Sequence, residues 1–108
     1  DEKKVLNAIA PHKDVDAFHP VNTGHIMIGD HSFLPCTPAG IMEMLKYYNI
    51  SVSGKKCVVI GRSNIVGLPI SKLLIDRNAT VTIAHSKTLD LGERKPIVRL
   101  WVFFLMID

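Results

Sequence analysis

The sequence has few aromatic residues and no run of basic ones. Phe, Trp and Tyr make up 6% of its 108 residues, and 13 Lys and Arg against 10 Asp and Glu leave a formal charge of +3. Proteins that bind single-stranded nucleic acid combine a basic groove with aromatic side chains on which bases stack. Because neither feature is present, we expect no nucleic-acid partner.

Long apolar runs are also missing. The longest, Leu100 to Ile107, has eight residues, whereas a helix needs about 20 to span a bilayer, so we expect no membrane association. The first residues, Asp1 to Lys4, contain neither an initiator methionine nor an apolar leader, and nothing in them indicates export. We expect the chain to begin inside a longer protein.

Cysteine and histidine do not show the spacing of a metal site. Cys36 and Cys57 form no C-x-x-C motif, and we interpret them as reduced, buried thiols of a cytoplasmic protein. No histidine has another four residues away, as a pair of ligands on one helix would. We therefore expect no metal at the histidines, which are His12, His19, His25, His31 and His85.

The length allows one small domain or part of a larger one, with 47% hydrophobic residues to form a core. Residues 1–10 are predicted to end a helix, because Val5, Leu6 and Ile9 recur at helical spacing before Pro11. Residues 12–37 show no lasting period and are predicted to be an irregular connector, of a length typical of functional or interdomain segments.

Regular structure is predicted from Thr37 onwards. Thr37 is expected to cap a helix that starts at Pro38 and ends at Asn49. Its apolar stripe is predicted to consist of Ile41, Met44, Leu45 and Tyr48.

A strand–helix–strand unit follows. Residues 57–60 have the continuous apolar character of a parallel strand covered on both faces. A helix is predicted from about residue 67 through 75, and a second strand over residues 79–84. Two strands joined by a helix within about 30 residues form a β-α-β unit, so we predict an α/β fold with a Rossmann-like parallel sheet and flanking helices.

The turn between the first strand and this helix, Gly61 to Gly67, suits an anionic ligand. Glycine lets the backbone turn sharply, and the helix N-terminus is expected to direct unpaired N–H groups at a phosphate. The turn lacks a glycine at Ser63, which the dinucleotide motif G-x-G-x-x-G requires, and it lacks the Gly-Lys-Ser/Thr ending of a triphosphate loop. An ordinary structural turn is the alternative interpretation.

The end of the second strand supports a dinucleotide. In adenosine-binding folds, a carboxylate about 20 residues beyond the glycine turn commonly holds the ribose 2′-hydroxyl. This chain has His85, Ser86, Lys87 and Thr88 there instead, with Arg62 in the turn. A cation and hydroxyls suit a 2′-phosphate, so NADP is favoured over NAD if a dinucleotide binds.

Five separated motifs resemble, in order and spacing, the bifunctional methylenetetrahydrofolate dehydrogenase/methenyltetrahydrofolate cyclohydrolase family over about residues 5–88. They are Lys13-Asp14-Val15-Asp16, Phe18-His19-Pro20-Val21-Asn22, Pro35-Cys36-Thr37-Pro38, Gly61-Arg62-Ser63-Asn64-Ile65-Val66-Gly67 and His85-Ser86-Lys87-Thr88.

The resemblance implies a two-domain, homodimeric, cytoplasmic enzyme. By resemblance, such an enzyme oxidises 5,10-methylenetetrahydrofolate with NADP and then hydrolyses the methenyl product to 10-formyltetrahydrofolate. Residues 1–36 would end the folate-side domain and connect it to a partial NADP-binding domain over 37–108. By resemblance, the NADP site includes Gly61, Arg62, Ser63 and Ser86, and Asp16 hydrogen-bonds the pterin ring of the folate.

The resemblance places the family's catalytic lysine, tyrosine and glutamine in the part of the enzyme that precedes residue 1, so no catalytic residue is assigned here. Two features depart from the family. Ala17 stands where a glycine is usual and would resist a positive φ. From about residue 89 the apolar tail differs from the family, and the fold would be incomplete. An inactive NADP-binding fragment, or a truncated product whose tail aggregates, is therefore the alternative.

Overall fold

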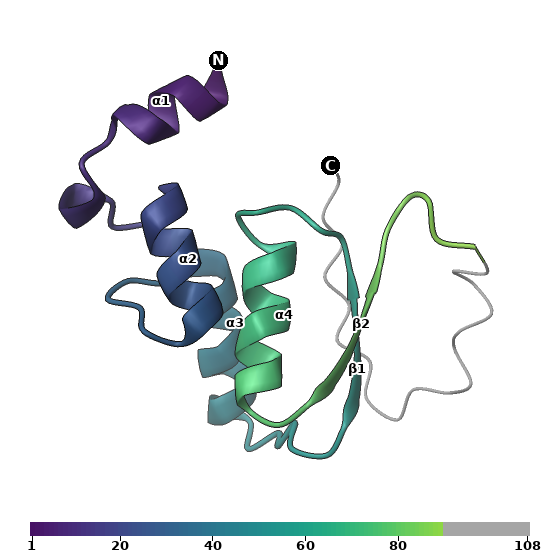
Figure 1. Cartoon of the computed structure of the whole chain (residues 1–108). Helices are drawn as coiled ribbons and strands as arrows, with labels where there is room; N and C mark the ends of the chain where they lie inside the picture. Colours follow the sequence, from purple (N-terminus) through teal and green to yellow (C-terminus); the bar gives the residue numbers. More distant parts are fainter. Residues whose placement is uncertain (90–108) are drawn as a thin grey trace.

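The computed structural model describes residues 1–89 (Figure 1). The tail predicted to depart from the family therefore lies, apart from Leu89, outside the described residues. In chain order the elements are α1 (Glu2–Ala8), the 3₁₀ helix η1 (Pro11–Lys13), α2 (Pro20–Ile28), α3 (Cys36–Tyr47), β1 (Lys56–Ile60), α4 (Gly67–Asp76) and β2 (Thr80–Ala84). No helix within residues 1–89 is both long and apolar enough to cross a membrane.

Strands β1 and β2 confirm the predicted β-α-β unit. They pair in parallel, from Lys56 opposite Thr80 to Ile60 opposite Ala84. The Gly61 N–H extends the ladder by donating to the carbonyl of Ala84 at 2.8 Å. Figure 1 shows the carboxyl ends of both strands at one end of the sheet, with α4 running back alongside them. The loops that follow the two strands therefore lie at the same end of the molecule.

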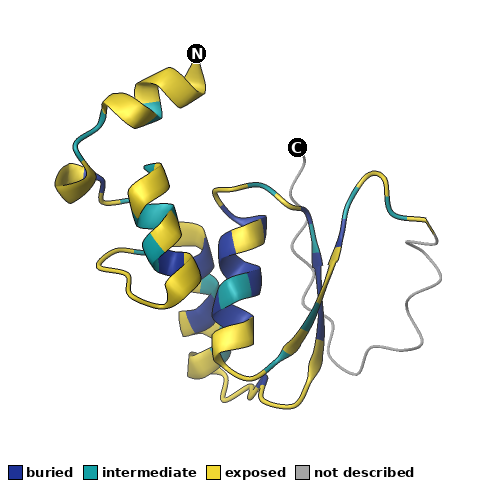
Figure 2. Cartoon of the chain, viewed as in Figure 1, coloured by how far each residue is buried: buried dark blue, intermediate teal, exposed yellow. Residues whose placement is uncertain are grey.

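The core joins β1 to α3 and α4. Figure 2 shows buried residues concentrated on these elements, while α1 is largely exposed. The cluster consists of Met42, Val52, Cys57, Val59, Ile70, Leu73 and Leu74. Strand alternation places Val58 on the opposite face from Val59, and it is buried too, so β1 is shielded on both faces as predicted.

The two cysteines differ in their surroundings. Cys57 is buried as expected, and burial raises the pKa of its thiol, which keeps it protonated and unreactive. Cys36 is exposed at the start of α3, so the prediction that both thiols are buried is wrong for this one.

Helix α2 corrects the prediction that residues 12–37 are irregular. Pro20 occupies its first turn, the ring Nδ1 of His19 accepts a hydrogen bond from the Val21 N–H at 3.1 Å, and Gly29 ends it in the left-handed conformation at φ 77°. Proline at the start and glycine at the end are ordinary helix boundaries. Because proline and glycine also occur in turns, this helix of nine residues was not predicted from the sequence.

Helix α3 begins earlier than predicted. It starts at Cys36 rather than Pro38. Pro35 occupies the N-cap position, where no side chain of residues 1–89 caps the helix, and Thr37 lies inside the helix, so the predicted cap by Thr37 is wrong.

The apolar face of α3 is only partly as predicted. Ile41 and Leu45 pack against the core, but Met44 and Tyr48 are 60% and 68% exposed. Met42 is the buried methionine of the helix, because the core of α4 and β1 lies on that side.

The glycine turn brings two pieces of backbone into contact. Gly61 has φ 129°, a region that side chains disfavour. A Cβ atom on Gly67 would lie 2.8 Å from the Arg62 nitrogen and from the carbonyl carbon and oxygen of Gly61. Residue 67 must therefore lack a side chain if α4 is to start directly above the end of β1.

Replacing Gly67 by Ala should lower the free energy of unfolding by about 1–3 kcal/mol, because the clash is with backbone and the turn has to shift. Chemical denaturation of the chain measures the change. Gly40→Ala, on α3 with open space around its Cβ, is the control and should stabilise by about 0.5–1 kcal/mol. Equal effects of the two substitutions would contradict the close contact.

Candidate functional site

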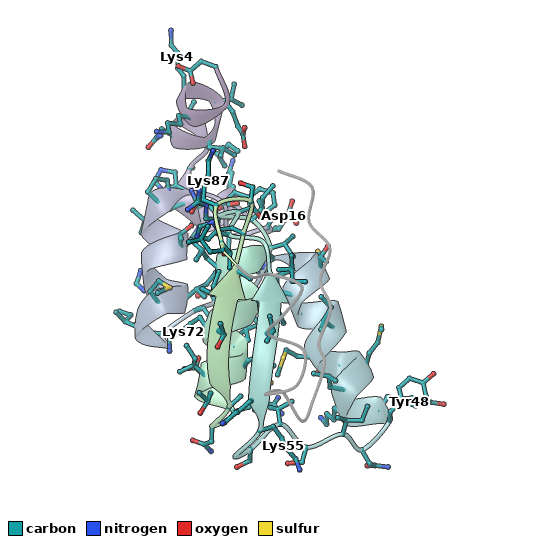
Figure 3. The ribbon with its side chains drawn as sticks, turned by 90° about the vertical axis from the view of Figure 1, so that its right-hand side faces the viewer. Lys4, Asp16, Tyr48, Lys55, Lys72 and Lys87 are labelled. Carbon is teal, nitrogen blue, oxygen red and sulfur yellow. The ribbon has the colours of Figure 1, made fainter. Side chains whose placement is uncertain are left out.

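Two loops form the candidate site at the carboxyl ends of the strands. Residues 61–66 follow β1, and residues 85–88 follow β2. Nη1 of Arg62 lies 3.4 Å from the ring nitrogen Nε2 of His85, so the loops meet through these side chains. Figure 3 shows Lys87 and Asp16 at this end of the sheet and Lys55 at the other. In open parallel sheets, ligands bind at this end of the strands.

Ser63 caps the helix that follows the turn. Its hydroxyl oxygen accepts hydrogen bonds from the N–H groups of Val66 and Gly67 at 3.2 and 3.3 Å. The Leu68 N–H donates to the Ser63 carbonyl at 3.0 Å, and Pro69 has no N–H. The first-turn donors of α4 are thus already used, and the prediction that they are unpaired and directed at a phosphate is wrong.

Backbone N–H groups without a partner in the described part of the chain are found instead in the loop itself. Within residues 1–89, the backbone N–H groups of residues 62–65 form no hydrogen bond. Successive free amides in a turn make an anion-binding concavity. The side chain of Arg62 is exposed and adds a full positive charge beside them.

The loop after β2 is a closed turn that presents its polar side chains outwards. The Thr88 hydroxyl accepts from the His85 N–H at 2.8 Å, and the Thr88 N–H donates to the His85 carbonyl at 2.8 Å. Ser86 and Lys87, between them, are exposed. Their hydroxyl and ammonium groups are therefore in solvent, directly after His85, which contacts Arg62.

A cavity of about 590 Å³ lies next to the glycine turn. Its lining comes from α1, from the start of α2 and from the turn, and among the predicted cofactor residues it includes Ser63 but not Gly61, Arg62 or Ser86. The residues that line it are Glu2, Lys3, Leu6, Asn7, Phe18, Pro20, Thr23, Ser63, Asn64 and Ile65. The cavity thus extends from the glycine turn to Phe18, in the segment that carries Asp16.

A buried carboxylate, Asp14, organises that segment. Its oxygens accept hydrogen bonds from the backbone N–H groups of Phe18 and His19 at 3.2 and 2.7 Å, and from the Asn22 amide at 2.9 Å. Burial by itself raises the pKa of Asp14, but the bonds from Asn22, His19 and Phe18 outweigh it and hold the pKa below its ordinary value of 3.8. The charged carboxylate is therefore the form that the fold stabilises.

Asp16 lies outside this network. It is partly buried, and its Oδ1 lies 3.5 Å from the Cys36 thiol, which donates to it. Ala17, the next residue, has φ 56° and is 2% exposed. The turn does require the positive φ that alanine resists.

Sequence reasoning overlooked Asp14, although the signal was present. Aspartate commonly accepts hydrogen bonds from backbone N–H groups a few residues ahead. Of the predicted site residues, Gly61, Arg62, Ser63 and Ser86 gather at the ends of the strands, and Asp16 belongs to a different loop. Within residues 1–89, no group of three or more His, Cys, Asp or Glu side chains is arranged to hold a metal ion.

Replacing Asp14 by Asn should lower the free energy of unfolding by about 1–3 kcal/mol, because an NH₂ group would then face a backbone N–H. Urea denaturation at neutral pH measures this. Asp76→Asn, which removes a partly exposed carboxylate paired with Lys72, is the control and should cost less than about 1 kcal/mol.

The same substitution should change the pH dependence of stability. The pKa of Asp14 is lower in the folded than in the unfolded chain, so its contribution is complete above 3.8 and is lost as pH falls through the lower folded value. Asp14→Asn should remove that part of the acid destabilisation. Parallel pH profiles for the original chain and the variant would show that Asp14 does not act in this way.

Comparison with known proteins shows that the part of the chain with the β-α-β unit and the glycine turn is similar to one family. Residues 35–97 match the model of the tetrahydrofolate dehydrogenase/cyclohydrolase NAD(P)-binding domain. The bifunctional protein FolD of Acetivibrio thermocellus is 60% identical over 93 residues, which are 86% of this chain and 33% of that protein. The chain thus spans about a third of the length of the curated relatives it matches.

Solved structures agree. The crystal structure of the bifunctional enzyme FolD from Campylobacter jejuni superposes with a TM-score of 0.89 at 44% identity, covering 96% of this chain and 37% of that one. The Trypanosoma brucei enzyme, crystallised with NADP cofactor and an inhibitor, gives 0.84 at 37% identity, covering 96% and 36%. Because the family model matches more than half of its residues and the described fold matches these structures, the chain belongs to the tetrahydrofolate dehydrogenase/cyclohydrolase family, in its NAD(P)-binding domain.

Proposed function

We propose that the chain is the cofactor side of an enzyme that oxidises 5,10-methylenetetrahydrofolate with NADP and hydrolyses 5,10-methenyltetrahydrofolate to 10-formyltetrahydrofolate. The observation that carries the proposal is the meeting of Arg62 with His85 beside the free amides of residues 62–65. This end of the sheet offers positive charge and N–H donors, which fit the phosphates of a dinucleotide.

The choice of NADP over NAD rests on Arg62. A guanidinium presents a fork of donors that matches a phosphate group. Residues 85–88, directly after β2, include no carboxylate to hold a ribose hydroxyl or to repel a 2′-phosphate, and Ser86 and Lys87 are exposed. The 2′-phosphate of NADP therefore pairs with the positive charge of Arg62, whereas NAD has no phosphate at this position.

The other residues have supporting roles in this proposal. Bound NADP supplies the hydride acceptor. Gly61 lets the backbone come close to the cofactor, and Ser63 holds the turn against α4. Asp16 accepts paired N–H bonds from the pterin, in a loop that Asp14 holds in place. Residues 1–36 then belong to the folate side and 37–108 to the NADP domain of a cytoplasmic homodimer.

A second candidate function is cofactor binding without turnover by the isolated chain. None of its 108 residues matches the lysine, tyrosine or glutamine that the family resemblance assigns to catalysis. Tyr47 and Tyr48 are exposed at the end of α3, away from the carboxyl ends of the strands.

The isolated chain should bind NADP but produce no NADPH when 5,10-methylenetetrahydrofolate is added. Absorbance of NADPH measures the reaction, and the full-length FolD of Acetivibrio thermocellus serves as the active control. NADPH formation by the chain alone, at a rate proportional to its concentration, would show that its own residues suffice for catalysis.

Replacing Arg62 by Ala should weaken NADP binding by about tenfold to hundredfold and leave NAD binding unchanged, because only NADP carries the 2′-phosphate. Isothermal titration calorimetry with both cofactors measures the difference. Arg77→Ala, an exposed arginine at the opposite end of α4, is the matched control and should alter neither affinity. Equal losses for NADP and NAD would refute the role of Arg62.

A further inference from the structure

His85 lies between two hydrogen-bond donors. Its Nδ1 is 3.2 Å from the backbone nitrogen of Lys87, and its Nε2 is 3.4 Å from Nη1 of Arg62. A neutral imidazole has one N–H and one bare nitrogen, and a protonated one has two N–H groups. The ring can therefore accept at most one hydrogen bond, and only one of these contacts is satisfied at any moment.

Of the two donors, the Lys87 N–H is the one from which the unprotonated ring nitrogen of His85 accepts a hydrogen bond. Its contact is the shorter one, and the turn of residues 85–88 holds the two groups together through both hydrogen bonds between His85 and Thr88. Arg62 has a long, exposed side chain that can turn away at little cost. The favoured tautomer thus has Nδ1 accepting from Lys87 and a proton on Nε2.

This tautomer makes the ring a donor that faces the guanidinium. Two donors from two loops then face each other across 3.4 Å with no acceptor between them among residues 1–89. An anion that accepts from both removes this conflict, and hydrogen bonds to a charged acceptor are about twice as strong as neutral ones.

We infer that His85 is a specificity-determining residue for the cofactor: it donates Nε2–H to the phosphate that Arg62 binds, and the Lys87 N–H holds it in the required tautomer. The inference rests on the proposed function, in which this phosphate is the 2′-phosphate of NADP. It adds a neutral donor to a site whose recognition would otherwise depend on Arg62 and Ser86.

The first test compares His85→Asn with the original chain. Asparagine keeps a short side-chain acceptor for the N–H two residues ahead, so the turn is preserved, but it has no donor at the position of Nε2. NADP binding should weaken about tenfold and NAD binding should not change, as measured by titration calorimetry. His31→Asn, at an exposed histidine between α2 and α3, is the control.

The outcomes separate this inference from the proposed function. If Arg62→Ala loses NADP selectively and His85→Asn binds NADP as the original chain does, His85 has only a structural role and the inference is wrong. If Arg62→Ala shows no selectivity either, the 2′-phosphate proposal itself fails.

A second test does not depend on cofactor binding. A long-range ¹H–¹⁵N correlation spectrum of the free chain at alkaline pH should show His85 with a bare Nδ1 and a protonated Nε2. The opposite tautomer would mean that Arg62 donates to the ring, and it would overturn the inference whatever the binding data show.

Discussion

The contact of Gly67 with the backbone of Gly61 and Arg62 constrains the whole functional end of the sheet. It allows α4 to begin directly above the end of β1, and α4 in turn sets where β2 returns in parallel. The loops after the two strands then share one edge, and Arg62 reaches His85. A larger residue at position 67 would separate the helix from the strand and, with them, Arg62 from His85.

Two aspartates two residues apart have different surroundings in the segment before α2. Asp14 is buried and accepts backbone and amide hydrogen bonds, whereas Asp16 is nearer the surface and touches only Cys36 among the described polar groups. Between Asp14 and α2 the chain passes through Ala17 at positive φ, which costs about 1–2 kcal/mol. The bonds to Asp14 offset this strain and fix the loop.

The β-α-β unit could be predicted from the sequence, whereas helix α2 and the individual hydrogen bonds of the candidate site could not. The apolar block over β1, the glycine turn and the β-α-β order follow from residue types and spacing, and the structure confirms them. Helix α2 was hidden because Pro20 and Gly29 also occur in turns. The cap by Ser63 and the double contact of His85 depend on which groups the fold brings together, and spacing alone does not reveal that.

Because Ser63 satisfies the first amides of α4 from within the chain, the glycine turn is held in shape without a ligand. Such preorganisation means that association need not spend conformational entropy on ordering this loop. The backbone of this edge is therefore fixed by contacts within the chain itself.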